Sequence, residues 1–550
     1  MVLAFILSFV ILLAWSLLTP KKEQLPPEKE KSQKTSEKIS NDLDKIPPGK
    51  TTIIPTGDKV KDNISQNVEE KEITIETPLY KVLFSNAGAM IKSVQLKEYF
   101  LTTKPNSPFI ELSGLEGQRD GLFQISFNGQ SQNENGREIY QVDHESIILS
   151  ADSPPRDLTF SSMRSDGVAI DQTFRFYPNR YDIDLSIKLT NRSENHVEGE
   201  VKADLKNMPP KDKKSYYSFV GIALLLDDKL EEIKTKKLKE DIVLSGSIGW
   251  VAYENEYFIT ALIPNDGQTK GNFVGRLAQS DVLKASYLTP SISLNPSEEI
   301  SSHFSLYMGP RDLDILKLSG KKIDLAINFG WTDIIAKPLH YALVFFHRYV
   351  KNWGLAIIIL TVLIKGIFWP LTQKSYRSMK EMQKLQPLMA KIREKYKGDK
   401  QLMNKELMSL YKTYKVNPMG GCLPMVIQIP VFFALFRILG TSIELRHAPF
   451  LLWINDLSAP DRLFRLPFEI PYMSPPYGIP ILTLLMGASM FIQQKMTPTP
   501  GDPAQAKVMM FLPLIFTVMF VNFPSGLVLY WITQNILSIG QQYRILKKSA

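Results

Sequence analysis

Lys365 is the residue whose type and position point most directly to chemistry. It lies in the segment 353–371, which is otherwise apolar and long enough to cross a bilayer. An ammonium buried at that depth costs several kcal/mol, so such residues usually face a cavity or a pathway. Alternatively, the side chain snorkels toward the membrane surface, since Thr372 is only about 10 Å further along a helix. The other hydrophobic segments contain no Asp or Glu, so water or a bound client must satisfy this charge.

Other patterns of catalytic chemistry are missing from the sequence. It contains no Gly-rich phosphate loop, no nucleophile triad, no zinc-protease motif and no paired carboxylates. The six histidines do not fall at metal-ligand spacing, and Cys422 is the only cysteine. The net charge of +9 gathers beside hydrophobic segments, which is not a nucleic-acid pattern. The sequence therefore predicts no enzyme, no catalytic residue, no cofactor, no metal and no nucleic acid as a specific ligand.

The first segment, residues 1–18, is almost wholly apolar. It fits either an uncleaved membrane anchor or a signal peptide cleaved near Ala14 and Ser16. We favour the anchor, because a basic N-terminal region is missing and the apolar run continues through Leu17 and Leu18. Residues 19–74 are rich in Lys, Glu, Ser and Pro, which predicts a flexible linker.

Alternation of apolar and polar residues predicts strands in the next region. Tyr181, Ile183 and Leu185 alternate with polar residues, and Val201, Ala203 and Leu205 repeat the pattern. Similar runs, separated by Gly, Asn, Asp and Pro, continue to about residue 306. We therefore expect one all-β sandwich of antiparallel strands over 75–310.

The remainder of the chain is predicted to be helical. Residues 331–350 suit an amphipathic helix lying in the membrane interface. Hydrophobic spans are expected at 353–372, 422–440, 478–494, 508–523 and 525–543. With the N-terminal anchor these give a multi-domain membrane protein, a β-sandwich domain plus an α-helical transmembrane bundle of six spans, five of them in the core.

Charge asymmetry sets the expected orientation. The loop 373–417 contains 12 Lys or Arg against 4 Asp or Glu, which places it in the cytoplasm. The β domain and the loop 441–477 then lie outside, whereas the loop 495–507 and the basic tail 544–550 lie inside. Lys21 and Lys22 oppose this orientation, but the larger charge bias decides it.

The cytoplasmic loop carries two helical patterns. Met382, Leu385, Met389 and Ile392 recur at helical spacing, as do Met403, Leu407, Leu410 and Tyr414, with a turn at 397–400 between them. This predicts an antiparallel helical hairpin. Its methionines either bind apolar clients or pack the seam between the two helices. They are Met379, Met382, Met389, Met403 and Met408.

Several collinear motifs run through the helical part. They are NPMGGCLPMVIQIPVFFALFR (417–437), LRHAPF (445–450), WINDLS (453–458), QQKM (493–496) and FPSGLVLY (523–530). These motifs resemble the signature of the YidC/Oxa/Alb membrane protein insertase family over about 331–548. The β region, through GWVAYENEYF (249–258) and MGP (308–310), is similar to the periplasmic domain of its Gram-negative branch.

The resemblance implies a hydrophilic groove open to the cytoplasm and to lipid. The family has an Arg in the second span where this chain has Lys365, so charge is kept and the bidentate guanidinium is lost. Thr361 and Trp531 should flank the path of the client helix. Further groove candidates are Gln428, Tyr530, Thr533, Gln534 and Asn535. For isolated polar residues such as Gln428 and Asn535, interhelical hydrogen bonding is the alternative interpretation.

The implied function is insertion, folding and assembly of integral membrane proteins, alone or with the Sec translocon. Expected partners are nascent membrane proteins, the lipid bilayer, the Sec translocon and the ribosome. The expected location is the inner membrane, with several spans and the large domain in the periplasm. Two other classes of protein are weaker alternatives. A secondary transporter should show inverted repeats and paired ionisable groups, which the sequence lacks. A sugar-binding β domain should show a carboxylate pair, and we find no convincing one in that region.

Overall fold

The computed structural model describes residues 70–115, 121–129, 138–209, 219–265, 270–278, 281–416, 423–496 and 503–547. The predicted anchor 1–18, most of the linker 19–74 and the motif residues 417–422 lie outside these ranges. So do residues 497–502 of the loop 495–507 and the last three residues of the tail.

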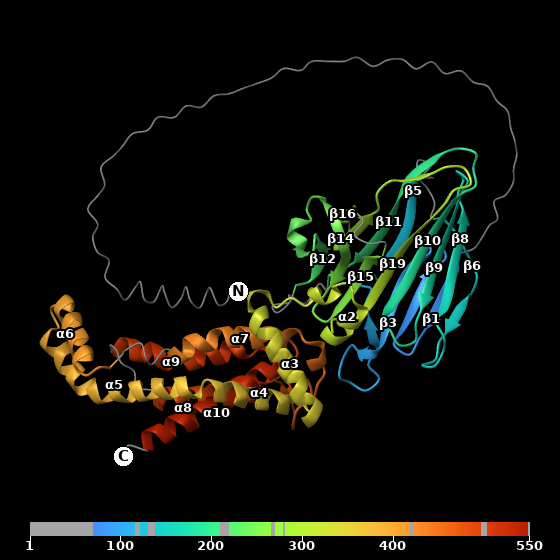
Figure 1. Ribbon diagram of the computed structural model, residues 1–550. Coiled ribbons are helices and arrows are strands. Elements are labelled where there is room, and N and C mark those ends of the chain that lie inside the picture. Colours follow the sequence, from blue (N-terminus) through green and yellow to red (C-terminus); the bar gives the residue numbers. More distant parts are fainter. Residues whose placement is uncertain are drawn as a thin grey trace, which may run out of the picture. The chain divides into compact units, whose positions relative to one another are not determined.

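The N-terminal half is a domain of two β layers (Figure 1). The strands of the first layer, in order of pairing, are β7 (Ser146–Ile148), β1 (Glu72–Glu76), β2 (Tyr80–Ser85), β3 (Met90–Phe100), β5 (Phe123–Gly129), β11 (Val197–Asn207), β17 (Leu283–Leu288), β16 (Lys270–Leu277) and β14 (Ile242–Glu254), with β4 (Phe109–Glu111) beside β3 and β18 (Ile292–Leu294) beside β11. Those of the second layer are β6 (Gln141–Val142), β8 (Arg156–Met163), β9 (Val168–Phe176), β10 (Asp182–Asn191), β19 (Glu299–Pro310), β15 (Phe258–Pro264), β14, β12 (Gly221–Leu226) and β13 (Lys229–Ile233). The long strand β14 belongs to both layers and joins them.

The alternation in the sequence becomes the burial pattern of the strands. On β10, Ile183, Leu185 and Ile187 point into the core between the layers, and their neighbours are half-buried. On β11, Val201, Ala203 and Leu205 do the same. The predicted sheet-rich domain is thus confirmed. One detail differs, because β1 and β7 pair in parallel while the other described pairings are antiparallel. The 69 residues between these two strands allow the crossover that parallel pairing requires.

A buried carboxyl group lies at the end of β14. Glu254 is 0% exposed, and neither of its oxygens has a hydrogen-bond partner in the part of the chain that the structure describes. The Nη2 of Arg311 lies 3.4 Å from Glu254 Oε2, but this guanidinium donates its hydrogen bonds to the carbonyls of Asn255 and Ala326 instead. Burial raises the pKa of Glu254 to about 7, because the nearby guanidinium offsets only part of the desolvation.

Glu254 should make the β domain less stable at higher pH. The folded domain keeps a proton that the unfolded chain releases above pH 4.5, so the free energy of unfolding falls as the pH rises toward 7. At about 1.36 kcal/mol per pKa unit, the loss is on the order of 3 kcal/mol. Glu254→Gln should flatten this dependence and raise the unfolding temperature at mildly alkaline pH. Thermal unfolding of the full chain in detergent, followed by the β signal in circular dichroism, measures it; parallel pH profiles for both proteins would contradict the argument.

The C-terminal half is helical, as predicted (Figure 1). The short helix α2 (Leu313–Ser319), whose Leu316 packs in the core of the β domain, and two 3-10 helices lead into it. Its α-helices are α3 (Asp333–Val350), α4 (Trp353–Ile367), α5 (Trp369–Lys395), α6 (Lys400–Thr413), α7 (Leu423–Thr441), α8 (Ile481–Met496), α9 (Pro503–Phe520) and α10 (Ser525–Lys547). Between α7 and α8 lies a small hairpin of β20 (Leu463–Arg465) and β21 (Gly478–Ile479). The helix α10 packs against both α4 and α8, and α3 packs against α4 and α7.

The helix predicted over 353–372 is interrupted. α4 ends at Ile367, and the chain bends by 64° before α5 begins at Trp369. Pro370 explains the break, since proline lacks an N–H and is favoured in the first turn of a new helix. Among the described residues, no single helix meets the length and hydropathy expected of a span, whereas α4 and α5 together do. Ile427–Thr441 and Met509–Phe520 are shorter apolar helices.

The helices α5 and α6 form the expected hairpin. Met382, Leu385 and Met389 of α5 are buried against Leu407 of α6. Asp399 caps α6, because its carboxylate accepts from the backbone N–H of Gln401 and Leu402. The predicted seam residue Tyr414 is exposed instead. It lies just beyond the last helical residue, and Tyr411 packs on the seam in its place.

Candidate functional site

Lys365 is enclosed between α4 and α10. Its side chain is 4% exposed, so it does not snorkel to the surface in this structure. The ammonium donates a hydrogen bond of 2.8 Å to the hydroxyl of Ser538. No carboxylate in the described ranges forms an ion pair with it. A serine hydroxyl thus accepts one of its three donors, and the expectation that water or a client satisfies the charge stays a prediction for the other two.

Ser538 is part of a polar stripe on one face of α10. Of this stripe, the sequence predicted only Gln534 as a site residue. Ser538 donates to the backbone carbonyl of Gln534, one turn earlier. One turn later, Gln541 exchanges hydrogen bonds of 3.0 and 3.1 Å with Thr372 of α5. Gln542 is buried as well, and its Oε1 has no partner in the described part of the chain. The spacing 534, 538, 541 and 542 on one face of an apolar helix was the available signal.

Thr361 and Gln428 occupy different surroundings. Thr361 lies one turn before Lys365, is buried, and donates to the carbonyl of Ile357 within its own helix. Gln428 on α7 donates to the hydroxyl of Tyr530 on α10, which is also buried. This is an interhelical bond, the alternative considered for Gln428.

Trp531 is half-buried in an aromatic cluster. Its ring meets Phe432 of α7 edge-on at 4.9 Å and Phe520 of α9 at 5.1 Å between centroids. Phe516 completes the contact at 6.1 Å. Such pairs favour a fixed ring orientation. Trp531 therefore lies where α7, α9 and α10 meet. It directly follows Tyr530 on α10.

The remaining polar candidates on α10 divide into two groups. Asn535 donates a hydrogen bond of 2.9 Å to Ser489 of α8, so it joins two helices. Thr533 donates to the carbonyl of Leu529 in its own helix. Gln534 is half-buried, and its Oε1 lacks a partner in the ranges described. Of these three, Gln534 alone belongs to the stripe that carries Ser538.

The five methionines of the hairpin are not equivalent. Met382 and Met389 are buried in the seam, and Met403 packs against it, which favours the packing interpretation for these three. Met408 is exposed, and Met379 is half-buried on α5 outside the seam. In this conformation, Met408 is the most exposed of the five methionines.

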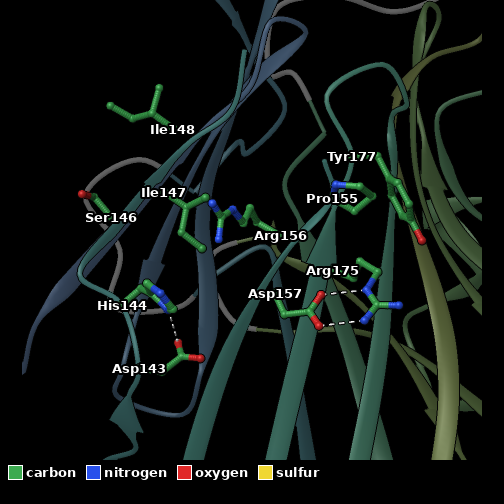
Figure 2. Close-up of a pocket in the computed structure, with 10 residues that line it drawn as sticks. All are labelled: Asp143, His144, Ser146, Ile147, Ile148, Pro155, Arg156, Asp157, Arg175 and Tyr177. Carbon is green, nitrogen blue, oxygen red and sulfur yellow. Dashed lines mark hydrogen bonds and ion pairs between the residues drawn. The ribbon is translucent and has the colours of Figure 1, made fainter. Parts of the chain in front are cut away.

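The β domain contains a separate cleft of about 770 Å³ between β7 and β8 (Figure 2). Two carboxylates line it, but both are engaged. Asp157 accepts two hydrogen bonds from Arg175, which lower its pKa, and Asp143 pairs with His144 at 3.0 Å. A general acid requires a proton at neutral pH, which Asp157 does not hold. Both carboxylates of the cleft are thus paired with neighbouring side chains. Among the described residues, no group of three or more His, Cys, Asp or Glu could hold a metal ion.

Comparison with known proteins agrees with this division of the chain. Residues 72–342 match the YidC periplasmic domain family, and residues 345–550 match the 60Kd inner membrane protein family. A membrane protein insertase YidC of Syntrophobacter fumaroxidans is 45% identical over 477 residues, 85% of either chain. One of Syntrophus aciditrophicus is 40% identical over 100% of this chain and 99% of its own. A crystal structure of an active YidC insertase covers 86% of this chain and 93% of its own, at 18% identity and a TM-score of 0.38.

The two-layer β domain, the helical bundle and these relatives define a class of protein: an inner-membrane insertase with a periplasmic domain, which is not an enzyme. The chain belongs to the YidC family of membrane protein insertases. Its clients are accordingly nascent membrane proteins, and it acts in contact with the lipid bilayer.

Proposed function

We propose that client helices enter the bilayer along the wall formed by α4, α7 and α10, and that Lys365 is the charge that draws them in. The observation that carries this proposal is the state of the ammonium. It is enclosed by apolar helices. Within the described residues it has no acidic partner, and it donates one hydrogen bond, to the hydroxyl of Ser538. Two of its three donors are left for water or for a client carboxylate.

The energetics of insertion favour such an arrangement. A client helix of ~20 apolar residues gains a few tenths of a kcal/mol per Leu or Ile on entering lipid, whereas a charged flanking residue costs up to ~3.5 kcal/mol. A cation placed between the helices lowers the cost of inserting an acidic flanking residue. The polar stripe Gln534, Ser538, Gln541 and Gln542 supplies further hydrogen-bonding groups toward the cytoplasmic end of α10. The client then leaves sideways into lipid, and no covalent step is needed.

The proposal includes the full topology. The anchor 1–18 and the spans built on α4, α7, α8, α9 and α10 give six crossings, with α3 lying in the outer interface. The hairpin 373–417 and the tail 544–550 face the cytoplasm, and the β domain and the loop 441–477 face the periplasm. Support comes from the charge of the hairpin, 12 basic against 4 acidic residues. Cooperation with the Sec translocon, and contact with the ribosome through the basic hairpin and tail, are part of the same proposal.

Photo-crosslinking tests the client path. A photoreactive amino acid at Trp531 or Gln428 should capture a nascent membrane protein stalled during synthesis. The matched control is Leu485, an exposed apolar residue on α8. Thr361 serves as a third site, although its burial should reduce the yield. Capture at Leu485 equal to that at Trp531 would show non-specific proximity in the membrane and would contradict the path.

A further inference from the structure

The loop between α7 and α8 exposes large apolar side chains that the insertion site does not use. Leu452, Phe464 and Tyr472 are 86%, 71% and 88% exposed. Phe468 is exposed on the same hairpin, β20 to β21, as Phe464 and Tyr472. Large apolar residues gathered on one exposed segment indicate a surface that contacts another phase or molecule.

The backbone of this loop is unusual at the same positions. Leu452, Phe464 and Tyr472 have φ values of 56°, 52° and 64°. Bulky residues seldom adopt this left-handed region, which costs on the order of 1 kcal/mol each and needs support from elsewhere. His447 in the same loop also has a left-handed φ, of 60°. The three apolar residues with this conformation are the ones that present the most exposed apolar side chains of the loop.

Specific hydrogen bonds hold the hairpin in place. Arg462 donates to the carbonyls of Val521 at 2.8 Å and Pro476 at 3.0 Å. The side chain of Asn522 donates to the carbonyl of Tyr472 and accepts from the backbone N–H of Ser474, both at 2.7 Å. Since Val521 and Asn522 follow directly on α9, the hairpin is clamped to the end of that helix.

This clamp fixes the level of the hairpin relative to lipid. In the topology proposed above, α9 ends at the outer leaflet. Its exposed apolar residues Leu514, Ile515 and Val518 extend to within about one turn of Asn522. The exposed residues of the hairpin continue this apolar surface at the depth where acyl chains meet headgroups. Tyr favours that depth, and Phe occurs on the apolar face of segments that lie in the interface. The neighbouring Arg465 is exposed and has no partner in the described ranges, so it can reach a lipid phosphate.

We propose that the hairpin is a membrane-contacting element whose side chains Phe464, Phe468 and Tyr472 insert at the outer-leaflet interface. It would hold the outer ends of α8 and α9 at constant depth while a client passes on the cytoplasmic side. The inference rests on the proposed topology, which places the end of α9 at the outer surface.

Spin labelling of the full chain tests this inference. The only cysteine is replaced by Cys422→Ser, single cysteines are introduced by Phe464→Cys, Phe468→Cys and Tyr472→Cys, and each is labelled with a nitroxide. The proteins are reconstituted into vesicles of phosphatidylethanolamine and phosphatidylglycerol, and collisions with oxygen and with a water-soluble nickel complex are compared. Matched controls are Glu469→Cys on the same hairpin and Gly398→Cys, where an added side chain meets no neighbour.

We expect the three apolar sites to collide with oxygen several-fold more than with nickel, relative to both controls. Nickel access equal to that at Gly398 would show a water-exposed loop and overturn the inference. Low access to both reagents would show that protein covers the hairpin, as the β domain or a second copy could, and would overturn it as well. The depth is measured without an insertion assay. A result that overturns the hairpin inference therefore leaves the proposed client path intact. Asn522→Ala should lower the oxygen preference at Tyr472 and so tests the clamp separately.

Discussion

Lys365→Glu should strongly reduce the insertion of clients that carry acidic flanks. Two unit charges about 4 Å apart interact by ~4 kcal/mol at an effective dielectric constant of ~20, and the substitution turns attraction into repulsion. Solvation removes part of this, so we expect a loss of at least about tenfold, which corresponds to ~1.4 kcal/mol. The measurement is the fraction of a protease-protected client made in cells that depend on the variant.

Two further substitutions at Lys365 separate charge from fit. Lys365→Arg should be tolerated, because charge is kept, although the guanidinium must find space beside Ser538. Lys365→Ala should fall between Arg and Glu. Immunoblots of the membrane fraction control for protein amount, since a buried Glu could also destabilise the bundle. Equal insertion by the Glu and Arg variants at equal abundance would show that the charge does not matter.

The sidedness of the loops should appear as an all-or-none labelling pattern. A cysteine at Gly398, in the turn before α6, should resist an impermeant thiol reagent added to intact spheroplasts. A cysteine at Glu469, in the loop before α8, should react under the same conditions. The reason is the strong excess of basic residues in the hairpin, which keeps it in the cytoplasm.

The labelling uses the Cys422→Ser protein as its background, which should give no signal. Permeabilised cells provide the control for Gly398→Cys, because the site is open and must react once the membrane is breached. Reaction at Gly398 in intact spheroplasts would invert the proposed topology and remove the basis for the client path.

The sequence predicted the fold where local patterns decide it. Alternation on Ile183, Leu185 and Ile187 was sufficient for β10, because a strand with one buried face repeats every two residues. It could not reveal the parallel pairing of β1 with β7, which depends on how the two layers close. Helical spacing located the hairpin and placed Tyr414 in its seam. Tyr414 is outside the seam because the helix ends at Thr413, and Tyr411 packs there instead.

The candidate site was predicted only in part. Lys365 is visible in the sequence because a charge interrupts an apolar segment. Its partner Ser538 is 173 residues away, and the polar spacing that marks it on α10 is a weaker signal than a charge in an apolar segment. Met382 and Met389 were ambiguous for a different reason. A thioether packs a seam and binds a client equally well, and only burial distinguishes the two roles.

The central claim, that the charge of Lys365 assists the client, is tested most directly by varying the charge of the client. Insertion of two clients that differ only in Asp versus Asn within the translocated flank should be compared in wild-type and Lys365→Ala backgrounds. The account predicts that the substitution slows the acidic client and leaves the neutral one almost unchanged. Full activity of Lys365→Ala on the acidic client would contradict it and leave Lys365 as a packing residue.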